Sequence, residues 1–151
     1  MSFIEELKAS LGEFWIPDIY AERVRTKRTR AFSLNIPERA NAPEILHTLL
    51  GVELKVGKSR IACPDLSTAR YLQVFARMGV RDVAVPYDIS KISSLADELE
   101  TGWQRMNLLL ESRSPRERNA AIKAVREAIK KAGPGDVMPA FDTPTRQRTP
   151  K

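Results

Sequence analysis

Apolar residues recur three and four positions apart in five stretches of the chain, a spacing that places them on one face of an α-helix. These stretches cover residues 3–11, 42–50, 66–78, 89–111 and 115–132. Capping residues support the boundaries. The first and last stretches follow a serine with glutamate three residues later, and the second follows an asparagine and ends at a glycine. The pattern therefore predicts five helices.

Four shorter segments have the features of β-strands. Residues 23–36 end in apolar positions that alternate with small or polar ones, and residues 80–86 are rich in valine. Between them, residues 52–56 and 60–63 are short runs joined by a tight glycine-containing turn. Residues 28–87 are thus predicted to follow the order strand, helix, strand, strand, helix, strand.

This order of elements is that of the ferredoxin-like fold. We therefore predict an α+β protein with a ferredoxin-like βαββαβ core. An N-terminal helix precedes the core, and a long amphipathic helix, a basic helix and a disordered tail follow it.

The positive charge of the chain is concentrated in its last quarter. The 151 residues carry a net charge of +6, from 25 Lys and Arg against 19 Asp and Glu. Residues 113–151 hold ten of these cations and four of the acids, a difference of six, so residues 1–112 are balanced. This division predicts a single α+β domain over residues 1–112, a basic amphipathic helix over 113–133 and a disordered tail over 134–151.

Composition also indicates where the protein acts. No apolar run reaches the roughly 18 residues that a membrane-spanning helix needs. The first twelve residues mix charged with apolar side chains, unlike a signal peptide. Cys63 is the only cysteine, so an internal disulfide cannot form. We therefore expect a cytoplasmic protein without membrane contact.

A run of basic residues precedes the first strand of the predicted core. Residues 23–30 contain five cations and no acid. An extended chain of this kind can follow a phosphate backbone, where each contact releases counterions. An alternative is that the five acids of residues 88–111 neutralise the run inside the fold. On the first interpretation, we expect RNA, in preference to DNA, to be bound by Arg23, Arg25, Lys27, Arg28 and Arg30.

The predicted helix over residues 115–132 carries the second group of cations. Its apolar stripe is narrow and most of its remaining surface is basic. Such a helix binds nucleic acid or an acidic protein, and it lacks the large apolar side chains that anchor a helix in a lipid surface. The phosphate-binding residues expected here are Arg118, Lys123, Arg126, Lys130 and Lys131.

The long helix over residues 89–111 suggests a different function. Its apolar stripe is longer than one small sheet covers, so a protein partner or a second copy of the chain would complete it. The residues expected at this contact are Trp103, Met106 and Leu110. The alternative function is thus that of a protein-interaction or assembly module, which includes a homodimer.

One short segment resembles a known motif. In residues 31–37, the aromatic Phe32 is followed by Leu34-Asn35-Ile36-Pro37. This segment resembles the first-strand motif of the RNA-recognition-motif family. The third-strand motif of that family, which supplies aromatic rings for stacking on bases, has no counterpart because residues 60–63 contain no ring. The stacking chemistry of that family is therefore not expected at this strand.

Enzymatic chemistry has little support in the sequence. Glu53 and Lys55 share a strand face and Asp65 follows, which resembles part of the site of nucleases related to restriction endonucleases, but the preceding acid has no counterpart. Cys63 and His47 are not brought together by the pattern, and a nucleophile needs a base. We therefore predict no catalytic residue, no metal site and no cofactor, with a metal-dependent nuclease as the third alternative.

Overall fold

The computed structural model describes residues 2–134 as a mixed α+β fold, so residues 135–151 of the predicted tail lie outside the described residues. The helical elements are α1 (Phe3–Leu11), η1 (Gly12–Phe14), α2 (Ile16–Ile19), η2 (Tyr20–Val24), α3 (Leu66–Arg77), α4 (Ile89–Leu110) and α5 (Pro115–Ala132). The strands are β1 (Thr29–Ser33), β2 (Glu44–Thr48), β3 (Gly51–Val56), β4 (Ser59–Cys63) and β5 (Asp82–Pro86).

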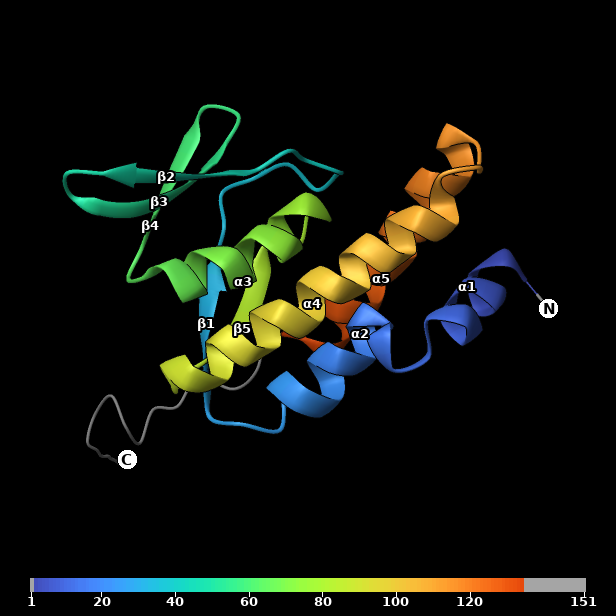
Figure 1. Ribbon diagram of the computed structural model, residues 1–151, viewed down its shortest axis with the longest axis horizontal. Helices are drawn as coiled ribbons and strands as arrows, with labels where there is room; N and C mark the ends of the chain where they lie inside the picture. The colour runs from blue at the N-terminus through green and yellow to red at the C-terminus, as the bar shows by residue number, and fades with distance from the viewer. Residues whose placement is uncertain (1, 135–151) are drawn as a thin grey trace.

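The strands form two small antiparallel sheets. One pairs β1 with β5, with Thr29 opposite Pro86 and Ser33 opposite Asp82. The other is the meander β2–β3–β4, which is inserted in the chain between β1 and β5. Helix α3 contacts both sheets and packs against α4 (Figure 1). The core of the protein therefore centres on α3, whose Tyr71, Leu72 and Phe75 are fully buried.

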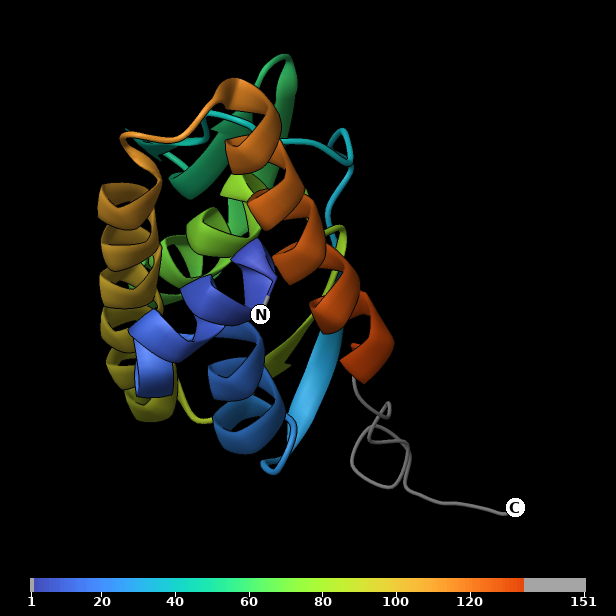
Figure 2. The ribbon, with the colours of Figure 1, turned by 90° about the vertical axis from the view of Figure 1, so that its right-hand side faces the viewer.

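The N-terminal segment fills the space between the two C-terminal helices. Figure 2 shows α1 and α2 between α4 and α5, and α2 contacts both of these helices. Gly102 allows α4 to approach η1 closely, because a Cβ atom at this position would lie 2.6 Å from the carbonyl oxygen of Phe14. Helix α5 adds four buried residues to the same core, namely Ala121, Ile122, Val125 and Ile129.

Four of the five predicted helices are confirmed. The capping boxes at the starts of α1 and α5 form as expected: Ser2 and Ser114 accept from Glu5 and Glu117, and these glutamates bond back to the capping residues. Asp65 and Asp88 cap α3 and α4. Within residues 2–134, no helix is both long and apolar enough to cross a membrane.

The predicted helix over residues 42–50 is wrong. These residues form β2 and its turn, with Ile45 opposite Leu54 of β3. The apolar spacing fitted either structure, and pairing with the β3–β4 hairpin decides in favour of the strand. As a result, Leu49 and Leu50 lie fully exposed at the hairpin tip. Asn41, the expected helix cap, instead donates to carbonyl oxygens of the preceding loop and of α3.

The ferredoxin-like topology is consequently not confirmed. One of its two helices is a strand, and the strands are divided between two sheets. The predicted strand over residues 23–36 is also too long at both ends, since β1 ends at Ser33. Tyr20 and Val24 are fully buried on one side of η2, which keeps the chain helical until Val24, and β1 begins only at Thr29.

Two tyrosine hydroxyl groups bond to the free edge of β5. Tyr20 of η2 accepts from the amide of Ala84 at 3.0 Å, and Tyr71 of α3 donates to the Ala84 carbonyl at 2.6 Å. The Tyr20 hydroxyl also donates to the carbonyl of Gly133 at 2.6 Å, at the end of α5. Ala84, Tyr20 and Tyr71 are all inaccessible to water. The hydrogen bonds among them therefore replace those that water would make. Burial in turn raises the pKa of both tyrosines.

Replacing Tyr20 with phenylalanine is expected to destabilise the fold. The variant leaves the buried amide of Ala84 without an acceptor, which costs about 1–3 kcal/mol. Urea denaturation should show this loss in the free energy of unfolding. The control is Tyr87→Phe, because the Tyr87 hydroxyl forms no hydrogen bond with residues 2–134, and its effect should stay below about 0.5 kcal/mol. Equal stability of the two variants would contradict the role of Tyr20.

Candidate nucleic-acid interface

The first two arginines of the basic run contact other parts of the protein. The Arg23 guanidinium forms an ion pair with Glu98 of α4. Arg25 donates to the carbonyl oxygens of Ala132 and Gly133, at the C-terminal end of α5. The last carbonyls of a helix lack partners within it and attract cations. Both arginines therefore hold helices against η2, and their charges are compensated inside the fold.

The other three cations of the run, Lys27, Arg28 and Arg30, have exposed side chains. Within residues 2–134, neither Lys27 nor Arg30 forms an ion pair with a carboxylate. Arg28 and Arg30 are two residues apart in extended chain, so both side chains leave from the same face. The predicted run is thus divided in two, and its second half remains at the surface.

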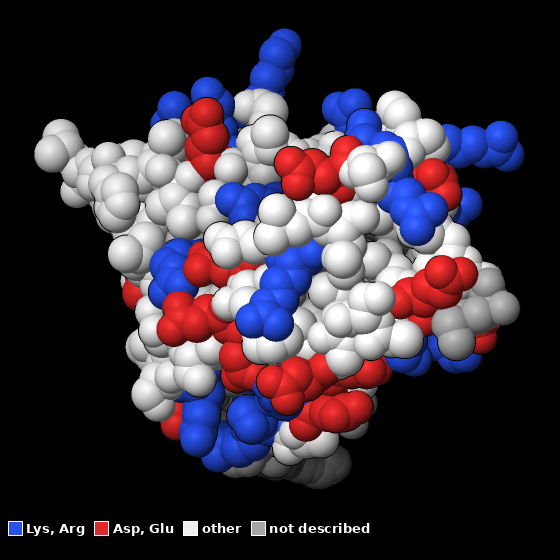
Figure 3. Space-filling view, turned by 45° about the vertical axis from the view of Figure 1, so that its right-hand side comes forward, with Lys and Arg blue, Asp and Glu red and all other residues white. Residues whose placement is uncertain are grey.

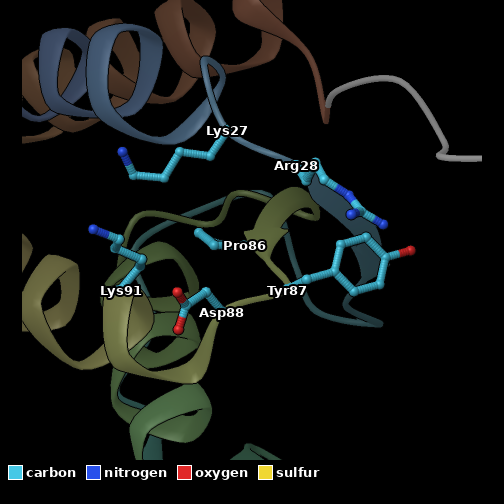
Figure 4. Close-up of a pocket in the computed structure, with 6 residues that line it drawn as sticks. All are labelled: Lys27, Arg28, Pro86, Tyr87, Asp88 and Lys91. Atoms are coloured by element: carbon cyan, nitrogen blue, oxygen red, sulfur yellow. The ribbon is translucent and has the colours of Figure 1, made fainter. Parts of the chain in front are cut away.

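Two aromatic rings accompany these arginines. The guanidinium carbons of Arg28 and Arg30 each lie 5.7 Å from the ring centroid of Tyr87. That of Arg30 also lies 4.9 Å from the ring of Phe32. These distances are within the range of cation–π contacts. Figure 4 shows the Arg28 side chain beside the Tyr87 ring. We call Arg28, Arg30, Phe32 and Tyr87 the cation–aromatic strip.

Tyr87 was missed by the sequence analysis. It follows β5 directly, and its amide donates to the carbonyl of Arg28 at 3.2 Å, which extends the β1–β5 ladder by one pair. Nearly 60 residues separate the two in the sequence, and only the antiparallel register of β1 and β5 brings them together. An aromatic residue after a valine-rich strand was the only signal in the sequence.

The cations of α5 differ in their surroundings. Arg126 donates to the carbonyl of Met78 at 3.0 Å, and Lys130 pairs with Glu38 at 2.9 Å. Glu38 raises the pKa of Lys130, and Lys130 in turn lowers that of Glu38. Arg118 donates to the carbonyl of Arg113. In the described part of the chain, the two exposed lysines of α5 that form no ion pair are Lys123 and Lys131.

The acids of α4 are used inside the fold. Glu98 pairs with Arg23, and Arg70 of α3 bridges Asp97 and Glu100. Its hydrogen bonds to Glu100, and then to Asp97, raise the pKa of Arg70. This arrangement joins α3 to α4, and within residues 2–134 none of these three acids pairs with Lys27 or Arg30. Figure 3 shows acidic and basic side chains interspersed over one face of the molecule.

The residues expected at a partner contact lie in different environments. Met106 and Leu110 are 1% exposed and pack in the protein's own core, while Trp103 is partly exposed. The apolar side chains that α4 presents to solvent near them are Leu108 and Leu109. A partner would therefore meet these two leucines, and of the predicted residues only Trp103.

The groups considered for catalysis do not form a site. His47 of β2 and Cys63 of β4 both lie opposite Val52 of the middle strand β3. The middle strand therefore separates the histidine from the thiol. Glu53 pairs with Arg60 at 3.3 Å, and Asp65 caps α3. Among residues 2–134, no group of three or more His, Cys, Asp or Glu side chains is placed to hold a metal ion.

Comparisons with models of known protein families, with curated proteins and with solved structures found no match.

Cys63 is expected to be a slowly reacting thiol. Burial, and then the nearby Asp65, raise its pKa to about 11, so about one molecule in a thousand is a thiolate at pH 8. An aromatic disulfide reagent should therefore label the native protein far more slowly than the protein in denaturant. The rate should rise with pH up to about 11 while the fold persists. Labelling of native protein at the rate of a free thiol would contradict this prediction.

Proposed function

We propose that this protein binds single-stranded nucleic acid without catalysis, RNA in preference to duplex DNA, through the cation–aromatic strip. The observation that carries the proposal is the placement of two exposed arginines over the ring of Tyr87. Bases of single strands stack on aromatic rings and on guanidinium planes, while arginine also binds phosphate. Stacked bases inside a duplex cannot make the first kind of contact, so the strip favours single strands.

The strip is suited to its ligand by rigidity as well as by charge. Phe32 is held in β1, and Tyr87 is fixed by its backbone bond to Arg28. Side chains on paired strands lose less freedom on binding than those on a mobile loop. Phe32 also belongs to the segment that resembles the first-strand motif of RNA-recognition-motif domains. The second ring comes from Tyr87 rather than from β4, so the arrangement differs from that of the family.

The remaining predicted cations divide into two groups. The first group already has partners within the fold, so we assign its members no direct contact with nucleic acid; it comprises Arg23, Arg25, Arg118, Arg126 and Lys130. Lys123 and Lys131 are exposed, and they supply additional phosphate contacts that do not depend on sequence. The main affinity is assigned to the strip, together with the neighbouring Lys27.

Replacing both arginines of the strip is expected to abolish most of the binding. Fluorescence anisotropy with a labelled single-stranded RNA should show an affinity loss of about tenfold or more for Arg28→Gln/Arg30→Gln at low salt. The slope of log affinity against log salt should fall by about 1.4, since each phosphate contact to a single strand contributes about 0.7. Tyr87→Leu should weaken binding to single strands more than binding to duplex.

The matched control removes the same charge elsewhere. Lys58→Gln/Arg116→Gln changes two exposed cations outside the strip and should leave the affinity within about twofold. If the control weakens binding as much as the strip variant does, the interaction depends on net charge and the strip has no special role. Absence of binding by the wild-type protein at low salt would remove the proposal.

A second function is supported by the exposed leucines. Leu108 and Leu109 are 68% and 43% exposed on α4, Leu108 lines a surface hollow together with the partly exposed Trp103, and this surface suits self-association. If the protein assembles here, light scattering should give a mass that rises above 17.0 kDa with concentration. Leu108→Gln/Leu109→Gln should then remain monomeric. A constant monomer mass for the wild-type protein would exclude self-association through these leucines.

A further inference from the structure

A hollow of about 270 Å³ lies between helix α5 and the loop that joins β1 to β2. Figure 2 shows this loop beside α5. Pockets for whole small molecules usually measure about 300–1,000 Å³, so the hollow suits a single chemical group better than a nucleotide. It shares no residue with the cation–aromatic strip, and it is lined by Arg39, Ala40, Asn119, Ile122 and Arg126.

The corner between α3 and β5 positions both arginines of this hollow. Arg126 donates to the carbonyl of Met78, the residue before Gly79, at 3.0 Å. Gly79 has a φ of +76°, and a Cβ atom there would lie 2.4 Å from the backbone nitrogen of Arg39. The absence of a side chain at Gly79 therefore allows the loop to pack directly on the corner. Asn41 fixes the loop further, because its side-chain amide donates to the Arg39 carbonyl at 2.9 Å.

The polar side chains of the hollow keep hydrogen-bond donors for a ligand. A guanidinium carries five N–H donors, and the bond to Met78 occupies only one nitrogen of Arg126. The Arg39 guanidinium is exposed, and it forms no hydrogen bond or ion pair within residues 2–134. The exposed side-chain amide of Asn119 adds two further N–H donors. Donors thus reach the hollow from both of its walls.

The charge around the hollow is positive. Among the described residues that line it, none is acidic. The acids next to the two arginines in the sequence are Glu38 and Glu127, and both pair with Lys130, at 2.9 and 3.8 Å. The hydrogen bond to Lys130, and then the charges of Arg81 and Arg126, lower the pKa of Glu38, so these cations lie near it. Lys130 and Arg81 balance the two carboxylates, which leaves the two guanidinium charges of the hollow for a ligand.

We propose that this hollow binds a phosphate dianion, either free phosphate or the phosphate group of a small monoester, between the guanidinium groups of Arg39 and Arg126. Arginine forks bind two phosphate oxygens at once, and Asn119 would bond to a third. A monoester carries nearly two negative charges, which matches the two guanidinium groups. A diester of a nucleic-acid backbone carries one, so this site is separate from the proposed function.

An NMR titration of isotopically labelled full-length protein with inorganic phosphate tests the site at constant ionic strength and about pH 8. The amide signals of Arg39, Gly79 and Asn119 should shift and saturate, with a dissociation constant of about 1 mM or below. Arg39→Gln should weaken binding about tenfold or more, because it removes hydrogen bonds between charged groups. Arg39→Lys should restore only part of the affinity, since lysine cannot form the two-pronged contact.

A parallel titration with glycerol phosphate distinguishes the two sources of the group. Binding of either ligand at these amides supports the proposal, and the tighter ligand identifies the source. Acetate, which carries one charge, should bind about fivefold more weakly than phosphate or worse.

The matched control is Arg116→Gln, which removes an exposed arginine of α5 outside the hollow. It should keep the phosphate affinity within about twofold. The Arg39→Gln variant should melt like the wild type without phosphate, because the side chain that it removes is exposed. The proposal is overturned if Arg39→Gln binds phosphate as the wild type does, if the control weakens binding equally, or if phosphate shifts only signals outside the hollow or none at all.

Discussion

The structure depends on satisfying the backbone at the free edge of β5. A two-stranded sheet leaves one edge of each strand unpaired, and that of β5 is buried. The hydroxyl groups of Tyr20 and Tyr71 take the place of a third strand at Ala84. Because Tyr20 bonds at the same time to Gly133, one hydroxyl joins the sheet to the end of α5. The packing of η2, α3 and α5 around β5 follows from these bonds.

The same requirement explains why the basic run is divided. The last carbonyls of α5 need donors where the helix ends, and Arg25 supplies them next to the Tyr20 bond. Arg23, two residues earlier on η2, reaches Glu98 of α4. The chain then leaves η2 and becomes extended, so the cations that follow lose contact with the helices. A uniform stretch of charge in the sequence therefore has two uses, one in stability and one at the surface.

Local signals predicted α1, α3, α4 and α5 because each of these helices begins with its own capping side chain. The two capping boxes and the aspartate caps act within four residues, and the structure forms all of them. The helix prediction failed at residues 44–48 because their apolar spacing fits a helix or a strand. The contact that decides between the two is made with β3. Tyr87 could not be predicted at the strip for a similar reason, since its neighbours in the fold lie nearly 60 residues away in the sequence. Long-range pairing, which the sequence does not display, positions the candidate site.

The insertion between β1 and β5 has a thermodynamic consequence. The two arginines of the strip lie in β1 or directly before it, upstream of the meander, and its tyrosine directly follows β5, downstream of the meander. The strip therefore exists only when β1 and β5 are paired. A ligand that contacts both the arginines and the tyrosine binds only the folded protein, so it shifts the folding equilibrium toward the native state. The size of the shift grows with the ligand concentration relative to the dissociation constant. The melting temperature of the protein would thereby become a sensor of occupancy.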